Sequence, residues 1–392
     1  MKYNIKQIEQ LVNSNSDKSA LNLIIATFKN DKADINKEDY LSLLRLQAKC
    51  ELNIYSDKRY IETLNIISGL SKHLNDKLIY VHQLIKEKEY RVAHDEYKVL
   101  RQSNLILSIL SAKQNKNKLL DICELFYRDY SLYLLKETLT SEAQRFTFSK
   151  EGTLRVKSFI NELFNVKLYE KKSNRKDHKP SYLSYPNISE EPYIDFTLKS
   201  NIELGSLLES IKVEVLHILE QRAGTPYVKN IPGVPAGFEH LIGNKDWRSV
   251  DIYASGELLV DRGKTLVSLL KKHFDLADCP PLSPEVMISI LEPGTHITPH
   301  YGTSNIKHTL HIPILLPEGD LGIKVGGVLK HWKYGECLLF DDSFKHEAWN
   351  NTNSTRIVLI VDIWHNELST TEKNFLKKIM PMIVNWRSNL NN

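Results

Sequence analysis

Histidines are concentrated in one part of this chain, where their context favours metal binding. Seven of the 14 histidines lie between residues 296 and 365, and imidazole is the commonest protein ligand of transition metals. His300 follows a turn bounded by proline and glycine, and His346 follows the polar stretch FDDSFK after an apolar strand. These two are the candidate metal ligands. Except for His311, the other histidines of the cluster are expected to be structural or exposed: His296, His308, His331 and His365.

Arg356 lies ten residues beyond His346 and opens the apolar strand RIVLIVDI. A guanidinium buried in such a strand needs a partner, because an unpaired buried charge is costly. A dicarboxylate ligand would supply that partner through a two-pronged hydrogen bond. A structural ion pair with Asp341 or Asp362 is the alternative interpretation.

Short strands are expected to carry these residues. After Gly233, strand-like runs alternate with Gly, Pro and Asn, for example at 249–254, 286–291, 309–315, 336–340 and 356–363. Many short strands with turn signals between them predict a barrel or sandwich of jelly-roll type. One amphipathic helix is expected before these strands, at 203–221, and another after them, from Thr370 to about Trp386.

The first half of the chain has a different pattern. Residues 1–168 contain few prolines and glycines, and their apolar residues recur at helical spacing. We expect an all-α domain of antiparallel hairpins there, repeat-like and loosely similar to a degenerate tetratricopeptide array, with Asn36 as an N-cap. A linker is expected at 169–194, where the basic run 171–179 is interpreted as solvated. Residues 195–392 would form the second domain.

Composition excludes several classes of protein. The 392 residues carry a formal net charge of +4 with a pI near 8.6, which is too mild to indicate nucleic-acid binding. The four cysteines lie far apart without a CxxC pair, which argues against a cysteine-bound zinc site and a disulfide framework. Neither a signal peptide nor a membrane-spanning segment is predicted, so a cytoplasmic location is expected.

Four long segments of the C-terminal half resemble one known family: SILEPGTHITPHYGTSN (289–305), LHIPILLPEG (310–319), LLFDDSFKHEAWN (338–350) and RIVLIVDIWHNEL (356–368). In order and spacing they resemble the aspartyl/asparaginyl β-hydroxylases, and fainter matches extend the resemblance to about residues 190–380. The resemblance implies a double-stranded β-helix catalytic domain, which is jelly-roll or cupin-like. It also implies that Fe(II), 2-oxoglutarate and O₂ are used to hydroxylate an unactivated carbon, with release of succinate and CO₂.

The resemblance assigns roles to individual residues. His300 and His346 would ligate the iron. Arg356 would bind the distal carboxylate of 2-oxoglutarate with help from the Ser289 hydroxyl, and His311 would hydrogen-bond the same cosubstrate.

The position two residues after His300 departs from the wider superfamily. It is Gly302, where most non-haem Fe(II) oxygenases carry a carboxylate ligand. The β-hydroxylases that act on protein aspartate share this glycine. Some non-haem halogenases also lack the carboxylate, so halogenation is an alternative, although the longer segments favour hydroxylation. Asp342 is expected to orient His346 or the loop that bears it.

The substrate side of the resemblance is weaker. Relatives that act on aspartyl side chains carry basic residues where this chain has Met287 and Thr309. Lys307 remains nearby, and Arg248 and Arg262 are considered as substitutes. Because a buried anion without cationic partners is disfavoured, the expected substrate is a neutral amino-acid residue of a peptide, protein or carrier-bound molecule, or the acyl group of a lipid.

The helical domain is expected to dock the substrate or its carrier on a concave surface, as helical-repeat arrays often do. An alternative of another class is a catalytically inactive protein, in which a helical scaffold carries a β domain that only binds.

Overall fold

The computed structural model describes residues 4–30, 35–55, 58–103, 106, 117–163, 177–196, 198, 203–228, 239–283 and 285–391. Contacts divide the chain into two compact units, Met1–Leu134 and Leu135–Asn392. Most of the basic run at 171–179 lies outside the described residues, so its interpretation as a solvated linker stays a prediction.

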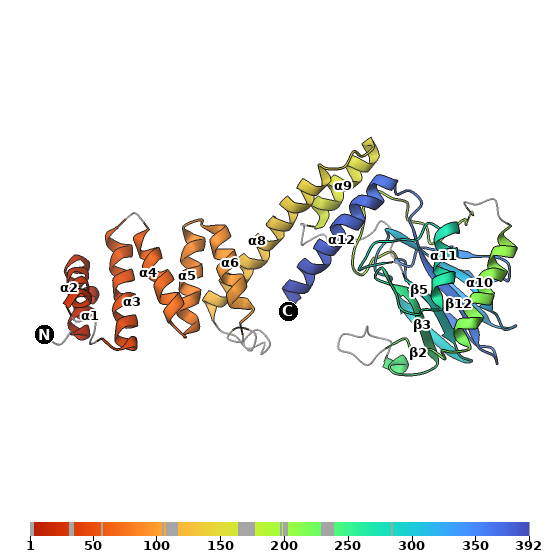
Figure 1. Cartoon of the computed structure of the whole chain (residues 1–392), viewed down its shortest axis with the longest axis horizontal. Helices are drawn as coiled ribbons and strands as arrows, with labels where there is room; N and C mark the ends of the chain where they lie inside the picture. The colour runs from red at the N-terminus through yellow and green to blue at the C-terminus, as the bar shows by residue number, and fades with distance from the viewer. Residues whose placement is uncertain are drawn as a thin grey trace. The chain divides into compact units, whose positions relative to one another are not determined.

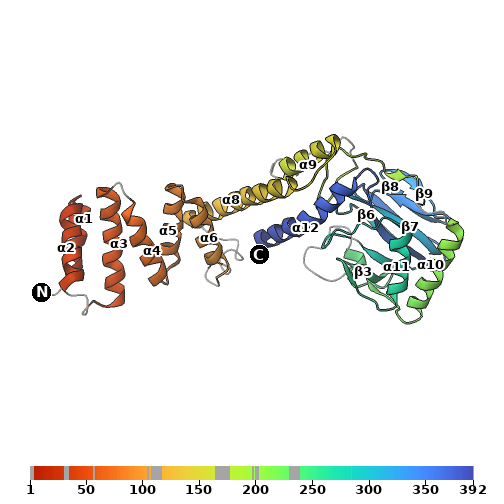
Figure 2. The same cartoon turned by 45° about the horizontal axis from the view of Figure 1, so that its top comes forward.

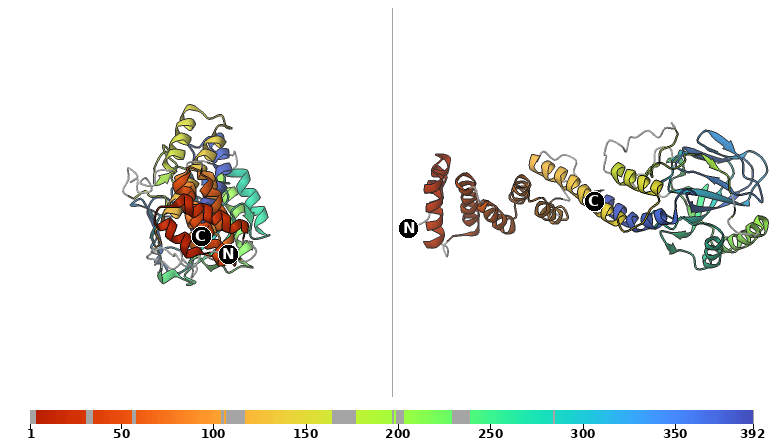
Figure 3. Two further views of the ribbon diagram at one scale, coloured as in Figure 1. Left: turned by 90° about the vertical axis from the view of Figure 1, so that its left-hand side faces the viewer. Right: turned by 90° about the horizontal axis from the view of Figure 1, so that it is seen from above.

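The first unit consists of helices that follow one another along the chain (Figure 3): α1 Ile5–Asn13, α2 Asp17–Asn30, α3 Lys37–Ile54, α4 Arg59–Leu70, α5 Leu74–Lys86, α6 Tyr90–Arg101 and the first part of α8 Lys118–Ala143. Consecutive helices pack against one another, and apolar residues such as Leu41 and Ile67 are buried between them. Asn36 caps α3, because its side-chain oxygen accepts a hydrogen bond from the Asp39 amide at 2.9 Å. The predicted all-helical N-terminal region is confirmed.

The second unit contains a β-sandwich (Figure 2). The larger antiparallel sheet has the order β1-β10-β7-β12-β5-β3-β2, and β4 pairs with β3. Its strands are β1 Tyr193–Ile194, β2 Thr225–Pro226, β3 Trp247–Ala254, β4 Glu257–Leu258, β5 Val286–Leu291, β7 Lys307–Leu315, β10 Leu338–Phe340 and β12 Arg356–Trp364. The smaller sheet has the order β6-β11-β8-β9, with β6 Thr295–His300, β8 Leu321–Val325, β9 Val328–Lys330 and β11 His346–Asn350. A helical region followed by a jelly-roll-like β domain is therefore confirmed as the fold class.

Two helices cover the outer face of the larger sheet (Figure 1). They are α10 Leu204–Leu219 and α11 Gly263–His273, and they share a buried apolar cluster with alternate residues of the strands, including Ile288 and Leu359. Side chains of a strand point alternately to its two faces. Every second side chain of a long strand therefore packs against the helices, and the side chains between them face the smaller sheet.

A second helical layer closes the unit. The end of α8, α9 Lys150–Leu163 and α12 Thr370–Asn391 share another buried cluster. The Arg155 guanidinium donates to the fully buried Glu372 carboxylate at 2.8 Å and ties α9 to α12. Residues 135–163, which the sequence pattern grouped with the helical half, therefore pack with the second unit. In the described part of the chain, no helix combines the length and apolarity that a membrane span requires.

Candidate active site

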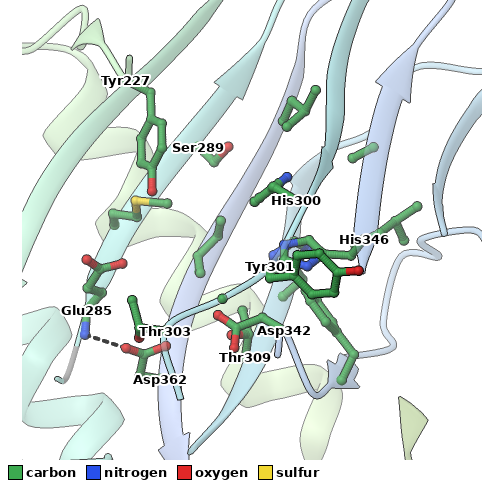
Figure 4. A pocket seen from close by; sticks show the side chains of 18 of the residues that line it. Tyr227, Glu285, Ser289, His300, Tyr301, Thr303, Thr309, Asp342, His346 and Asp362 are labelled. Atoms are coloured by element: carbon green, nitrogen blue, oxygen red, sulfur yellow. Dashed lines mark hydrogen bonds between the residues drawn. The ribbon is translucent and has the colours of Figure 1, made fainter. Parts of the chain in front are cut away.

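Polar side chains line a cavity between the two sheets. Strand alternation places Ser289, His311 and Arg356 on the inner face of the larger sheet, opposite the helices. The cavity has a volume of about 220 Å³ and is partly open to solvent. Its polar and ionisable lining residues are Tyr227, Glu285, Ser289, His300, Tyr301, Thr303, Lys307, Thr309, His311, Asp342, His346, Arg356 and Asp362. Figure 4 shows several of them converging from strands of both sheets.

The two candidate metal ligands lie side by side in this cavity (Figure 4). His300 ends β6 and His346 begins β11, and the two are directly paired across these strands with ring centroids 4.0 Å apart. The Nδ1 atom of His300 is 2.8 Å from the Thr298 carbonyl oxygen, and that of His346 is 2.9 Å from the Phe344 carbonyl oxygen. Because Nδ1–H donates to a carbonyl, each neutral ring carries its lone pair on Nε2, the atom that can bind a metal.

Electrostatics keep both rings in the neutral form that metal binding requires. Burial, together with the adjacent His346 ring, lowers the pKa of His300 to about 3. Burial also lowers the pKa of His346, although the nearby Asp342 carboxylate opposes this shift. The donor set therefore fits Fe(II) as a pair of neutral imidazoles.

Gly302 explains why no carboxylate ligand follows His300. A Cβ atom added at Gly302 would lie 2.2 Å from the Asp342 side-chain carbon and 2.3 and 2.5 Å from its oxygens. The space that a side chain at position 302 would need is thus already filled by the Asp342 carboxylate. Within the described ranges, no group of three or more His, Cys, Asp and Glu side chains is arranged to hold a metal ion.

Arg356 is buried without a carboxylate partner among the described residues. Its side chain donates to the Ser289 hydroxyl at 3.2 Å and lies over the Trp332 ring, and its Nε atom has no hydrogen-bond partner in the described structure. Burial lowers the pKa of the Arg356 guanidinium to about 9. An anion bound beside the guanidinium would offset the cost of burying its charge. The alternative ion pair with Asp341 or Asp362 is not formed, since Asp362 pairs with Lys307 instead.

Ser289 and His311 are both oriented toward the same part of the cavity. The Ser289 oxygen accepts hydrogen bonds from Arg356 and, at 3.2 Å, from the Trp247 indole. A hydroxyl has two acceptor sites and one proton, so its proton is left to donate. The Nδ1 atom of His311 accepts from the Trp332 indole at 3.2 Å, and burial keeps the pKa of His311 well below its usual value. The neutral His311 ring therefore carries its proton on Nε2.

The predicted substrate residues Met287, Lys307 and Thr309 all line the cavity. Lys307 is already paired with two carboxylates, because its ammonium lies 2.7 Å from Asp362 and 3.0 Å from Asp342. Burial opposes ionisation of Asp342, but the Lys307 charge and hydrogen bond, together with the nearby His346 and Thr309 side chains, outweigh it and hold the pKa of that carboxyl below its usual value.

The proposed substitutes for a basic substrate contact do not line the cavity. Arg248 pairs with Glu292 at the edge of the sheet, and Arg262 precedes α11.

Sequence reasoning missed several residues of the site. Tyr227, Glu285 and Asp362 line the cavity, and the Trp247 indole holds Ser289. Asp362 was detectable, because it shares strand parity with Arg356 in the segment RIVLIVDI and so must point to the same face. Tyr227 and Glu285 lie just beyond the ends of strands, where strand alternation does not predict the direction of a side chain.

Comparisons with known proteins point to one family. Residues 208–366 match the family described as aspartyl/asparaginyl beta-hydroxylase. The human protein named aspartyl/asparaginyl beta-hydroxylase is 32% identical over 144 residues, which are 36% of this chain and 19% of that protein. The ornithine lipid ester-linked acyl 2-hydroxylase of Rhizobium tropici is 46% identical over 78 residues, which are 19% of this chain and 28% of that protein.

Among solved structures, a cupin 2 conserved barrel domain protein from Salinispora arenicola CNS-205 is 12% identical, with a TM-score of 0.21, over 34% of this chain and 87% of that one. The matched part of the chain spans only 19% and 28% of the length of the two curated relatives described above. The family match covers the two histidines, Arg356 and every other residue placed around them in the cavity. Residues 208–366 of this chain are therefore a domain of the aspartyl/asparaginyl β-hydroxylase family of 2-oxoglutarate-dependent oxygenases.

Proposed function

We propose that the second unit hydroxylates an unactivated carbon with Fe(II), 2-oxoglutarate and O₂. One observation carries the proposal: two neutral, paired histidines share a single cavity with a fully buried arginine that has no carboxylate partner among the described residues. The histidines suit a divalent metal, and the arginine suits a dicarboxylate. Together they match the two ligands that this reaction class requires.

The side chains of the site have distinct tasks in this proposal. When bound, Fe(II) and 2-oxoglutarate supply with O₂ the oxidising equivalents that turn a C–H bond into C–OH, releasing succinate and CO₂. His300 and His346 hold the metal through Nε2, because their Nδ1 atoms are held by backbone carbonyls. Arg356 and the Ser289 proton bind the distal carboxylate, and the Nε2 proton of His311 is available as a further donor.

The charge of the cavity supports hydroxylation over halogenation. The carboxylate of Asp342 fills the space beside Gly302, where the superfamily's third ligand would be attached. Burial raises the pKa of Asp342, but the Lys307 charge and hydrogen bond, together with the nearby His346 and Thr309 side chains, lower it by more and favour the ionised form. A chloride ion replacing the missing ligand would lie against this negative charge, which disfavours its binding.

The same charges bear on the substrate. Glu285, Asp342 and Asp362 line the cavity, while Lys307 is already paired with two of them. An aspartyl side chain entering here would meet carboxylates, and Arg356, the lining cation without a carboxylate partner among the described residues, would already be taken by the cosubstrate. We therefore propose a neutral amino-acid residue of a peptide, protein or carrier-bound molecule as the substrate.

An acyl chain is the second candidate, and two observations favour it. The positions Met287 and Thr309 present no charge to the cavity. In addition, one relative is named as an acyl 2-hydroxylase of a lipid. The helical first unit would dock the molecule that carries either kind of substrate.

The metal and cosubstrate site is tested by anaerobic titration of the full chain with Fe(II) and 2-oxoglutarate, followed by the visible metal-to-ligand charge-transfer band. We expect His300→Ala to abolish the band and Arg356→Ala to weaken it. The matched controls His331→Ala and Arg222→Ala remove the same residue types from exposed positions outside the cavity. They should leave the band unchanged. A folded, metal-loaded wild-type protein without the band would contradict the proposal and favour the inactive scaffold.

A further inference from the structure

A segment upstream of the family domain runs along both loops that carry the candidate metal ligands. This segment, residues 177–185, is called the strap here. It lies before residues 208–366, the part that matches the family, and it contains no regular helix or long strand. Its sequence, DHKPSYLSY, reads as a linker. Most of its hydrogen bonds, however, go to two loops more than 100 residues away, in the same compact unit.

The strap first pairs with the loop that precedes His346. The Lys345 amide donates to the Asp177 carbonyl at 2.6 Å, and the Lys179 amide donates to the Ser343 carbonyl at 2.9 Å. These bonds form an antiparallel bridge between His178 and Phe344. The carbonyl of Phe344 is the group that accepts the Nδ1 proton of His346. The strap thus fixes the backbone that orients one ligand.

The strap then crosses the loop that follows His300. The amide and the hydroxyl of Ser181 both donate to the Gly302 carbonyl at 2.9 Å. The amides of Tyr182 and Leu183 both donate to the Thr303 carbonyl, also at 2.9 Å. The two loops are joined directly as well, because the Gly302 amide donates to the Asp342 carbonyl at 2.6 Å. One segment therefore holds both ligand-bearing loops in register.

His178 is the side chain that locks the strap in place. It is buried, and its Nε2 atom lies 2.7 Å from the Ser343 hydroxyl, which in turn donates to Asp341 at 2.5 Å. Since the hydroxyl proton is used on Asp341, His178 donates through Nε2. The His178 ring also packs on the Phe344 ring, with centroids 4.5 Å apart. Both contacts restrain the residues immediately before His346.

We propose that the strap is part of the catalytic machinery and that His178 is a positioning residue for the metal ligand His346. It acts through Ser343 and Phe344, and it touches neither metal nor substrate. Groups that orient metal ligands typically change metal affinity by about 10- to 100-fold when they are mutated. The inference rests on the metal site proposed above, although its effect on the two loops is independent of metal.

The test compares His178→Asn with His273→Asn in the full chain. His273 is also a buried histidine of the second unit, but it ends α11 and lies outside the strap and the cavity. In metal-free protein we expect faster amide hydrogen exchange in peptides 300–306 and 341–346 of His178→Asn only. We also expect its Co(II) dissociation constant, measured by visible absorption, to rise about 10- to 100-fold. The melting temperatures of the two metal-free variants should be similar.

Ser181→Ala provides a milder second variant. It removes one of the two donors to the Gly302 carbonyl and leaves the backbone bond in place. Faster exchange confined to peptide 300–306 would support the strap even if His178→Asn failed to fold. Wild-type exchange and wild-type Co(II) affinity in folded His178→Asn would overturn it. If the wild-type chain bound no Co(II), the proposed function would fail, while hydrogen exchange would still decide whether the strap holds the loops.

Discussion

The steric conflict at Gly302 yields a prediction with a magnitude. In Gly302→Ala the new Cβ would lie 2.2 Å from the Asp342 side-chain carbon, more than 1 Å inside ordinary van der Waals contact. Asp342 cannot move aside freely, because the Lys307 ammonium lies 3.0 Å from its carboxylate and only 15% of its side chain is exposed. Overpacking of this kind costs about 1–3 kcal/mol. We expect Gly302→Ala to lower the free energy of unfolding of the second unit by that amount.

The assay uses the distribution of tryptophan. All five tryptophans lie in the second unit, so tryptophan fluorescence during urea unfolding of the metal-free chain reports on that unit alone. Asp342→Ala makes room for the added methyl group. The double variant should therefore be more stable than the sum of the single effects by about 1–3 kcal/mol.

The control is Gly205→Ala in α10, where an added Cβ meets nothing within 4 Å. This change should stabilise the helix slightly. Wild-type stability of Gly302→Ala, combined with additive effects in the double variant, would refute the argument that Asp342 occupies the place of a third ligand.

Three further predictions follow from the buried charges. Arg356→Met should raise the dissociation constant of 2-oxoglutarate about 30-fold or more, because truncating one partner of a buried charge pair costs about 2–5 kcal/mol. Calorimetry on Co(II)-loaded protein measures this constant. An unchanged dissociation constant would show that Arg356 is not part of the cosubstrate site. Lys307→Met leaves Asp342 and Asp362 without their shared cation and should lower the free energy of unfolding of the second unit by about 3–5 kcal/mol. Adding Asp362→Asn should partly restore stability in the same fluorescence assay. A decrease in unfolding free energy below about 1 kcal/mol would contradict the prediction. Burial, with a neighbouring histidine in each case, lowers the pKa values of His300 and His308 to about 3 from 6.5, so the unfolded chain takes up protons below pH 6.5 that the folded chain does not. These two groups therefore stabilise the metal-free protein fully only above about pH 6.5, and together they cost about 3 kcal/mol of stability at about pH 5.5. Burial raises the pKa of Glu285 to about 7, which acts in the opposite direction over the same range. The profile is therefore measured in a Glu285→Gln background, where an unfolding free energy that stays flat between about pH 7.5 and 5.5 would contradict the prediction.

The strongest strands could be predicted from the sequence, and the strands that carry the ligands could not. The run at 286–291 coincides with β5, and the run at 356–363 falls one residue short of β12, because apolar, β-branched residues mark buried strands. β6 (THITPH) and β11 (HEAWN) belong to the smaller sheet and are rich in polar residues. Their local pattern does not distinguish them from turns, although they place His300 opposite His346.

Tertiary contacts account for the rest of what the sequence did not reveal. Lys307 was expected near the substrate, but only the fold shows that Asp342 and Asp362 engage it. The strap has the prolines and serines of a loop, and it has no regular helix or long strand. Its partners are backbone and side-chain groups more than 100 residues away, which no local pattern encodes.

The bond between α9 and α12 has a consequence for the order of events during synthesis. Arg155 and Tyr185 both contact Glu372, about 190 to 220 residues further along the chain, and Glu372 is completely buried. Until α12 has emerged from the ribosome, the apolar faces of α9 and of the end of α8 lack the partner with which they form their buried cluster. Contacts between residues so far apart in the sequence form slowly, because closing a long loop costs chain entropy. The helical first unit, whose contacts are between sequence neighbours, can fold while the ligand-bearing strands are still being made.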